Sequence, residues 1–382
     1  MIEESKNSKG VIALAAGGTG GHLFPAQALG EELVRRGYVV HLMSDERVRD
    51  YGAKFPAADT HVISAATIIV RKPWTWPKSI FKIWSGYSKA RKVFEQTKPL
   101  AVIGFGGYPS LPPMLAGNKL GIATLLHEQN AVMGRANKLL ARWADKIASS
   151  FPKIVNLDAK LASKTVMTGN PVRDLVLKSA AAKFAGPSPK QDFRILVFGG
   201  SQGAQFFSQM MPKVFAEMPQ AMLKRLSVVQ QCRPEDIEVV KAEYEKLGLK
   251  FELQAFFADM PKRIANAHLV IGRSGASTIA ELGVIGRPAI LVPLPHAIDN
   301  DQLKNAESFC TAGGGWILEQ KNISADSLAA FLTRLRYEPE DLNRAAFAAL
   351  GQGQPKAAQN LADLVEQTIA THKKPILTKK EQ

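Results

Sequence analysis

Two glycine-rich turns, each placed between an apolar strand and a helix, constrain the fold of this 382-residue chain more than any other feature. Residues 11–16 are apolar and lead into Gly-Gly-Thr-Gly-Gly-His at residues 17–22. Apolar residues then recur at helical spacing through Leu33, and residues 38–43 form a second apolar run. A strand, a tight turn, a helix and a parallel strand make up the repeating unit of a doubly wound sheet.

The second turn repeats this plan in the other half of the chain. Residues 194–198 form an apolar strand, residues 199–203 read Gly-Gly-Ser-Gln-Gly, and a helical stretch is expected from Ala204. In the first unit we expect Pro25 in the first helical turn. The sequence therefore predicts an α/β protein with two Rossmann-like, doubly wound domains that face each other across a cleft.

The domain boundaries are expected at loops that separate these units. The N-terminal domain is predicted to span residues 1–170 and the second domain residues 171–345. Residues 346–382 include an amphipathic helix, which we expect to pack back on the N-terminal domain, and a frayed polar tail.

Ligands bind at the carboxyl ends of strands in such sheets, so the residues that follow each strand are candidates for a site. The first turn lacks the third glycine of a dinucleotide fingerprint and the Lys of a P-loop, and its backbone N–H groups suit a diphosphate. His22 ends this turn, where it acts either as a general base or as a residue that fixes the loop. Another strand ends in His-Glu-Gln-Asn at residues 127–130, where Glu128 is a second candidate base or a residue that orients a neighbour.

The second half offers polar groups at equivalent positions. Ser201 adds a hydroxyl to the second glycine turn. Thr278 and Glu281 have the spacing of a helix capping box, and the alternative is that Glu281 binds the two hydroxyls of a ribose. Asp299 and Asp301 have the spacing found in metal-using glycosyltransferases, but no second acidic cluster accompanies them, so we expect a sugar-binding loop and no metal site.

The positive net charge of the chain and one segment that mixes aromatic with basic residues indicate a polyanionic partner. The chain carries 49 Lys and Arg against 34 Asp and Glu, a net charge of +15. Residues 68–92 interleave Trp, Phe and Tyr with Lys and Arg, which suits an anionic membrane surface, although RNA stacking or a core with a solvated basic face are alternatives. No apolar run approaches the ~20 residues of a membrane span, so we expect a cytoplasmic or peripheral protein.

Six motifs occur in an order that resembles the MurG family, the peripheral-membrane N-acetylglucosaminyltransferases of peptidoglycan synthesis. They are GGTGGHLFPA, FGGYPS, HEQN, GNPVR, GGSQGA and RSGASTIAE, and they extend over both predicted domains. The resemblance implies a GT-B fold and an inverting, metal-independent transfer that needs no cofactor. N-acetylglucosamine (GlcNAc) would pass from UDP-GlcNAc to undecaprenyl-diphospho-MurNAc-pentapeptide (lipid I), which gives lipid II, at the cytoplasmic face of the bacterial inner membrane.

The resemblance also implies roles for individual residues. The expected catalytic residues are His22, Tyr108 and Glu128. The residues expected to contact substrate are Thr19, Gly20 and Gly21 in the cleft; Asn130 at the donor sugar; Arg173 and Ser201 at the diphosphate-sugar portion; Phe257 at the uracil through its backbone; Ala276, Ser277 and Thr278 at the nucleotide; Glu281 at the ribose; and Gln302 at the GlcNAc hydroxyls. Asp301 stands where relatives often carry Gln.

Other functions fit part of the pattern. Another UDP-sugar transferase or a UDP-GlcNAc 2-epimerase would share the fold, and a nucleotide-sugar sensor would bind the donor without turnover. We expect no nucleic-acid partner, because RNA binding would leave the two glycine turns unexplained. Cell-wall synthesis proteins are possible partners.

Overall fold

The computed structural model describes residues 8–17, 19–48, 55–66, 73–155, 157–295 and 297–372, with the side chains of residues 73, 201–204 and 298 excepted. Residues 68–72 of the aromatic–basic segment, the side chain of Ser201 and the predicted frayed tail from residue 373 therefore lie outside the described residues. The chain divides into two compact units: unit 1 comprises Met1–Arg173 and Lys356–Gln382, and unit 2 comprises Asp174–Pro355. Each unit is described by itself.

Unit 1 is built on a parallel seven-stranded sheet with the order β3-β2-β1-β4-β5-β6-β7. Its strands are β1 (Val11–Ala15), β2 (Val39–Ser44), β3 (Asp59–Val62), β4 (Ala101–Gly104), β5 (Ala123–Glu128), β6 (Lys146–Ser149) and β7 (Thr165–Met167). Its helices are α1 (Gly20–Arg35), α3 (Trp76–Thr97), α4 (Leu111–Lys119), α5 (Arg135–Leu140) and α15 (Ala357–Thr371), with short 3-10 turns that include η2 (Pro73–Thr75), η3 (Tyr108–Ser110) and η4 (Ala159–Lys164).

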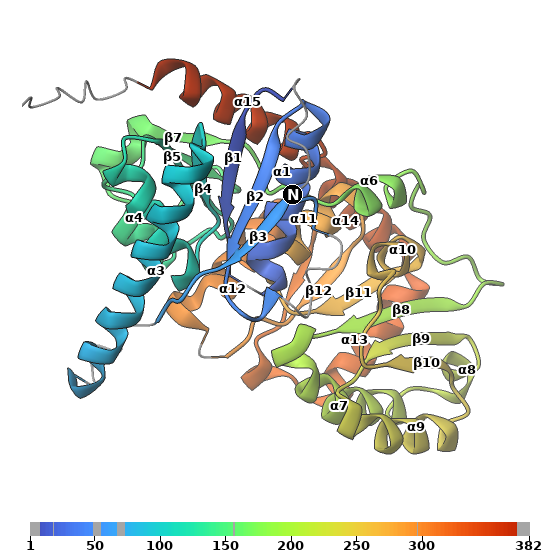
Figure 1. Ribbon diagram of the computed structural model, residues 1–382. Helices are drawn as coiled ribbons and strands as arrows, with labels where there is room; N and C mark the ends of the chain where they lie inside the picture. The colour runs from blue at the N-terminus through green and yellow to red at the C-terminus, as the bar shows by residue number, and fades with distance from the viewer. Residues whose placement is uncertain are drawn as a thin grey trace, which may run out of the picture. The chain divides into compact units, whose positions relative to one another are not determined.

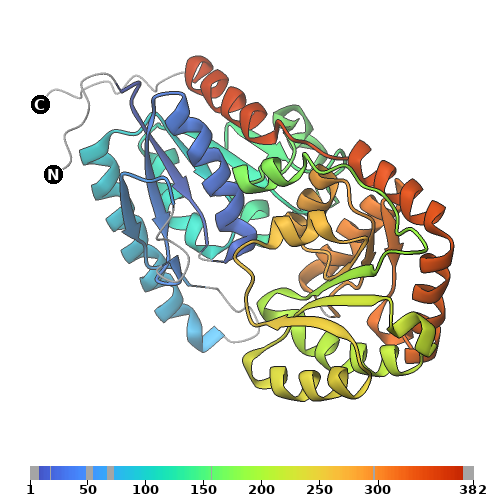
Figure 2. The same ribbon diagram turned by 90° about the vertical axis from the view of Figure 1, so that its right-hand side faces the viewer.

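The two faces of this sheet carry different helices (Figures 1 and 2). Side chains alternate along β1, so that Ile12 and Leu14 join a core with α1 and α15, whereas Ala13 and Ala15 join a core with α3 and α4. Small residues on the second face let α3 and α4 approach closely. Both faces are thereby covered, which explains why the strands are continuous apolar runs.

Helix α15 returns to unit 1 and packs on α1. Leu361 and Val365 are buried in the α1 core, and Arg36 bonds both Asp363 and Glu366 at 2.7 Å. The preceding helix α14 (Pro339–Gly351) belongs to unit 2, which ends at Pro355, so the boundary predicted after residue 345 falls inside this helix. Its residues pack on α11 (Ala276–Ile285) and on the unit 2 core, and burial of that apolar face holds α14 there.

Unit 2 repeats the design with a parallel six-stranded sheet in the order β10-β9-β8-β11-β12-β13. Its strands are β8 (Phe193–Phe198), β9 (Leu226–Gln231), β10 (Lys250–Gln254), β11 (Leu269–Gly272), β12 (Ala289–Leu291) and β13 (Gly315–Ile317). Besides α11 and α14 its helices are α6 (Asp174–Ser179), α7 (Gly200–Ala216), α8 (Gln220–Leu223), α9 (Ile237–Lys246), α10 (Met260–Asn266), α12 (Asp301–Thr311) and α13 (Ala325–Tyr337), with short turns η5 (Pro234–Asp236), η6 (Ile298–Asn300) and η7 (Gln320–Asn322).

Both sheets reverse their winding direction at one point. In unit 1 the chain winds outward from β1 through β2 and β3, then returns to pair β4 on the other side of β1. In unit 2 the same reversal occurs between β8 and β11. The loops after the two strands diverge at such a switch point and leave a crevice for ligand. The switch points therefore locate the candidate sites in each unit.

The two helices that follow the glycine turns start earlier than expected. Helix α1 begins at Gly20, which places Pro25 inside the helix, and α7 begins at Gly200 and not at Ala204. The turns are thus shorter, and their glycines already form the first helical turn. The first N–H groups of a helix have no partner one turn back in the helix, so a helix start of this kind is suited to bind an anion.

Candidate active site

A cavity of about 300 Å³ lies at the switch point of unit 1, between the loops that follow β1 and β4. Its lining comprises Gly17, Thr19, His22, Asp45, Arg47, Ala65, Ala66, Gly107, Tyr108 and Pro109. The structure thus brings together three predicted site residues, Thr19, His22 and Tyr108. Asp45 and Arg47 were missed by the sequence reasoning, although their position just after β2, at the same sheet edge, is a signal that could have found them.

The glycines of the loop after β4 make room for the His22 ring. Gly106 has a φ of +84° and Gly107 a φ of +73°, a conformation that other residues rarely adopt. A Cβ at either position would lie 3.4 Å from the His22 ring. The turn therefore carries Tyr108, the first residue of η3, to the same cavity as His22 without a steric clash.

Burial keeps the His22 imidazole neutral. Loss of hydration lowers the pKa of His22 below its usual value of 6.5, and the charge of Arg47 lowers this pKa further, while the Gln129 side chain and the Phe105 backbone partly oppose the shift. A neutral imidazole at physiological pH can accept a proton. Because the ring also lines the cavity, His22 remains a candidate for the general base.

The remaining residues of the first turn adjoin an Arg–aromatic stack. Thr19 is the N-cap of α1 and accepts backbone bonds from His22 and Leu23 through its carbonyl. A Cβ on Gly20 would approach the Phe24 ring to 3.0 Å, and the Arg173 guanidinium lies 3.9 Å from the centre of that ring. Gly21 faces open space, so its backbone is accessible to a ligand.

Glu128 occupies a structural position at the end of β5. The carboxylate is 1% exposed, and it accepts bonds from Asn130 N at 3.0 Å, Gly134 N at 2.9 Å and Asn137 Nδ2 at 2.8 Å. Burial raises the pKa of Glu128, and these bonds oppose the rise. Glu128 does not line the cavity that contains His22. The geometry therefore favours the second alternative for Glu128, a residue that orients its neighbours, including the half-buried Asn130.

In unit 2, predicted residues lie on both sides of the β8–β11 switch point. Gly200, with a φ of +65°, opens α7, and its N–H donates to Gln231 Oε1 at 3.2 Å. Ala276, Ser277 and Thr278 form the first turn of α11, whose N-cap is Gly275. The Ser277 hydroxyl is buried without a hydrogen-bond partner in the part of the chain that the structure describes. Both helix starts present small residues, which lets a ligand approach the backbone.

The capping-box alternative for Glu281 is wrong. A capping box would place Thr278 at the N-cap, but α11 begins two residues earlier, so Glu281 lies in its second turn. Glu281 is nearly buried at 9% exposure. A carboxylate at that depth remains a candidate for binding the hydroxyls of a ribose.

Two further predicted residues complete the unit 2 candidates. The Gln302 side chain accepts a bond from Leu294 N at 3.0 Å, and the Gln302 carbonyl accepts one from Ser274 Oγ at 2.7 Å, which ties the loop after β12 to the start of α11. Phe257 is buried after β10, and Arg263 lies over its ring at 5.0 Å. Among the described residues, no group of three or more His, Cys, Asp or Glu side chains could hold a metal ion, and Asp301 is therefore part of no such group.

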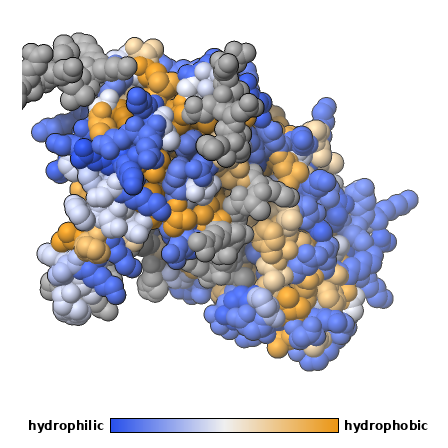
Figure 3. All heavy atoms as spheres, in the orientation of Figure 1, coloured by the Kyte–Doolittle hydropathy of each residue, from blue (hydrophilic) through white to orange (hydrophobic). Residues whose placement is uncertain are grey.

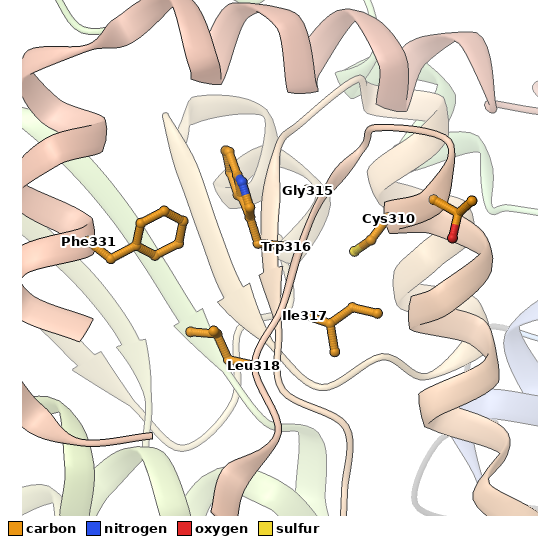
Figure 4. Close-up of a pocket in the computed structure, with 7 residues that line it drawn as sticks. Cys310, Gly315, Trp316, Ile317, Leu318 and Phe331 are labelled. Atoms are coloured by element: carbon orange, nitrogen blue, oxygen red, sulfur yellow. The ribbon is translucent and has the colours of Figure 1, made fainter. Parts of the chain in front are cut away.

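A second cavity in unit 2 contains none of the predicted residues (Figure 4). Its lining comprises Cys310, Thr311, Gly315, Trp316, Ile317, Leu318 and Phe331, at the edge of the sheet along β13. Apolar side chains predominate in it, and its lining includes no histidine, carboxylate or basic side chain. This cavity is therefore no candidate for the active site.

The turn η2, with Trp74, and helix α3, with Phe81 and Trp84, expose aromatic side chains of the predicted membrane segment, whereas Tyr87 is partly buried against the unit 1 core. Trp74, Phe81 and Trp84 are 73%, 65% and 62% exposed, so the alternative that they form core is wrong. The N-terminal end of α3 extends beyond the sheet in Figure 1, and Figure 3 shows apolar and near-neutral side chains beside hydrophilic ones there. Among the described residues no helix is long and apolar enough to cross a membrane.

Comparisons with known proteins agree with this arrangement. The N-terminal domain of glycosyltransferase family 28 matches residues 12–149, and the C-terminal domain of that family matches residues 194–361. A UDP-N-acetylglucosamine--N-acetylmuramyl-(pentapeptide) pyrophosphoryl-undecaprenol N-acetylglucosamine transferase of Sinorhizobium fredii is 50% identical over 94% of this chain and 95% of its own length. The enzyme of the same name from Rhizobium leguminosarum is 47% identical over 95% of this chain and 96% of its own.

A solved structure shows the same fold. The crystal structure of Acinetobacter baumannii MurG superimposes with a TM-score of 0.75 and 29% identity, over 94% of this chain and 99% of that one. The chain therefore belongs to the MurG family of glycosyltransferases, with the N-terminal and C-terminal domains of glycosyltransferase family 28.

Proposed function

We propose that the protein transfers GlcNAc from UDP-GlcNAc to lipid I, which yields lipid II and UDP. Membership of the family supports this proposal, because full-length relatives at 47–50% identity carry the corresponding name. The observation that carries it furthest is the unit 1 cavity, where a neutral His22 lies beside a glycine turn suited to a diphosphate. An acceptor that contains a diphosphate and a nucleophilic hydroxyl fits both features.

In the proposed reaction the 4-hydroxyl of the acceptor sugar attacks the anomeric carbon of GlcNAc. The new C–O bond forms as the bond to the UDP oxygen breaks, and the configuration at the anomeric carbon inverts. His22 accepts the hydroxyl proton at a ring nitrogen, and UDP leaves with the electron pair of the broken bond. General-base catalysis of this kind contributes about 10²- to 10⁴-fold to the rate.

Unit 2 supplies the donor site in this proposal. The helix N-termini at Gly200 and Ala276 direct backbone N–H groups at the edge of the sheet where the diphosphate of UDP-GlcNAc would bind. Such preorganised donors stabilise the charge that develops on the leaving group. Glu281 would bind the ribose, and the Phe257 backbone would contact the uracil.

We expect transfer to be independent of metal ions, because the helix N-termini can stabilise the leaving diphosphate. In the presence of EDTA, the purified protein should form product from UDP-GlcNAc and a lipid I analogue at its full rate. The measurement is acceptor-dependent release of UDP, with and without added Mg²⁺. Turnover that EDTA abolishes and Mg²⁺ restores would refute metal independence.

We also propose that α3 binds an anionic membrane surface. Trp76, Ile80 and Trp84 follow one another at four-residue spacing and form an apolar stripe. Exposed basic residues flank it, and Glu95 is the single acidic residue of α3. Aromatic side chains at the headgroup level together with Lys and Arg are typical of peripheral membrane binding.

Changing Trp74, Phe81 and Trp84 together to Ser should weaken binding to vesicles of anionic lipid by about 100-fold, because burying each ring contributes more than 1 kcal/mol. Cosedimentation with phosphatidylglycerol vesicles measures this. The control is Phe347→Ser, which removes a still more exposed ring, 81% accessible, from α14 of unit 2. Equal vesicle affinity of the triple variant and this control would contradict the proposal for α3.

A further inference from the structure

Arg47 is the single Lys or Arg side chain among the described residues that line the unit 1 cavity. It follows β2, which ends at Ser44, and none of the six sequence motifs includes it. Its side chain is 57% exposed, and its positive charge lowers the pKa of His22, which lines the same cavity. A cation therefore acts on the place where the proposed function puts the reacting acceptor.

Two hydrogen bonds hold the end of β2 against the first glycine turn. Ala16, the residue before Gly17, donates from its N–H to the Met43 carbonyl at 3.1 Å. The buried Ser44 hydroxyl donates to the Ala16 carbonyl at 2.8 Å. The residues that follow β2 and the glycines that follow β1 thus start from one fixed point, which explains why Arg47 and the glycine turn line a single cavity.

Asp45 fixes the direction of the Arg47 side chain. Asp45 Oδ1 accepts from the Arg47 backbone N–H at 3.0 Å, and the two carboxylate oxygens accept from Arg47 Nε at 3.1 Å and from Nη2. Nη1 has no hydrogen-bond partner in the part of the chain that the structure describes. The Asp45 side chain is 19% exposed, so the cation is the more accessible member of the pair. An oriented guanidinium with N–H donors to spare suits the oxygens of a phosphate.

We propose that Arg47 binds the diphosphate of the acceptor and that Asp45 positions Arg47 for this contact. The inference rests on the proposed function, because it adds a side chain to the cavity in which that function places lipid I. Nη1 and the second N–H of Nη2 donate to phosphate oxygens, and the backbone N–H groups of the glycine turn bind the same diphosphate. The proposed donor residues belong to unit 2, so Arg47 acts on the acceptor alone.

The cavity suits a diphosphate better than a carboxylate of the acceptor's peptide. It offers two kinds of group that bind anions, the Arg47 cation and the helix start at the glycine turn. A diphosphate has two anionic groups and can engage both, whereas a single carboxylate is matched by the guanidinium alone. The wall that follows β3 is formed by Ala65 and Ala66, which leave room for the ligand and add no charge.

Binding of a diphosphate probe tests the inference without turnover. Geranyl diphosphate is titrated by calorimetry into protein saturated with UDP, so that the donor site is already occupied. We expect Arg47→Gln to weaken the affinity at least about tenfold, because a hydrogen bond to a charged group contributes at least that factor, and Arg47→Lys to lose less. Absence of binding to the wild-type protein, or equal affinity of the wild type and Arg47→Gln, would overturn the inference.

Steady-state kinetics identify which part of the acceptor Arg47 contacts. Arg47→Gln should raise the KM for a lipid I analogue at least about tenfold and leave the KM for UDP-GlcNAc within about twofold. The same rise is expected for an analogue that keeps the diphosphate and lacks the pentapeptide. A rise confined to the acceptor with the peptide would assign Arg47 to a peptide carboxylate and refute the contact with the diphosphate. A rise confined to the KM for UDP-GlcNAc would refute it as well.

Arg35 offers a matched control within unit 1. It donates to Glu32 Oε2 from Nε at 3.1 Å and from Nη2 at 2.9 Å, and its side chain is 49% exposed. It lies in the last turn of α1, whereas the cavity lies at the start of that helix. Arg35→Gln should keep the affinity for geranyl diphosphate and the KM for the lipid I analogue within about twofold. A loss as large as that of Arg47→Gln would reduce the effect to net charge and contradict a specific contact.

Failure of this inference and failure of the proposed function give different results. A wild type that forms lipid II, with Arg47→Gln unchanged in both tests, overturns the role of Arg47 alone. A wild type that binds geranyl diphosphate through Arg47 but transfers no GlcNAc to lipid I supports the contact and overturns the proposed function.

Discussion

Replacing His22 with alanine is expected to lower kcat by about 10²- to 10⁴-fold, because the acceptor hydroxyl loses the group that accepts its proton. KM for UDP-GlcNAc should change little, since His22 lies in unit 1 and the predicted donor residues after β8 and β11 lie in unit 2. Initial rates at saturating lipid I analogue, with UDP-GlcNAc varied, separate the two constants. A large rise in KM at constant kcat would make His22 a binding residue.

The pH profile gives an independent check on the same group. A base must be neutral to act, so kcat/KM should fall as the pH drops through the pKa of His22. Burial places that pKa below 6.5, and the acid limb should therefore lie below pH 6.5. In His22→Ala the limb should disappear from the residual rate. A limb that persists in His22→Ala would belong to another group.

Replacing Glu128 with alanine is expected to destabilise the protein by about 3 kcal/mol or more. The change leaves three donors, the backbone N–H groups of Asn130 and Gly134 and the amide of Asn137, without their acceptor in a buried position. Each unsatisfied donor costs about 1–3 kcal/mol. Chemical denaturation followed by fluorescence measures the free energy of unfolding.

Activity and stability together decide between the two roles of Glu128. If Glu128 orients the loop from Asn130 to Asn137, Glu128→Gln should lose stability and activity in parallel, because one oxygen becomes a donor that faces a donor. If Glu128 were the base, Glu128→Gln would keep its stability while kcat fell by orders of magnitude. The control is Glu217→Ala on the exposed surface, which should change stability by less than about 0.5 kcal/mol.

Local sequence patterns predicted the positions of the strands and turns that hold the site. The strands predicted before Gly17, before Gly199 and at the His-Glu-Gln-Asn motif of residues 127–130 became β1, β8 and β5, because strands covered on both faces need no polar residues. Glycine runs marked the turns for a steric reason that the structure makes explicit at Gly106 and Gly107. The start of each helix was less certain, since glycines after a strand fit either a loop or the first helical turn.

What the sequence could not predict depends on contacts between distant residues. The carboxylate of Glu128 meets donors up to nine residues away, and Asp45 and Arg47 reach the His22 cavity only because β1 and β2 are neighbours in the sheet. His127 on β5 lies 3.1 Å from the Gly169 carbonyl, a contact that spans 42 residues of sequence. The boundary predicted after residue 345 fell inside helix α14, because its apolar face carries no mark of the partner it packs on.

Direct detection of the product tests the central claim, that this chain moves GlcNAc from UDP-GlcNAc to lipid I. Purified protein is incubated with radiolabelled UDP-GlcNAc and lipid I, and the lipid fraction is separated and counted. We predict label in a lipid-linked disaccharide, in amounts equal to the UDP released and dependent on the lipid I supplied. Conversion of UDP-GlcNAc without lipid I, or binding of the donor with no labelled lipid, would contradict the assignment.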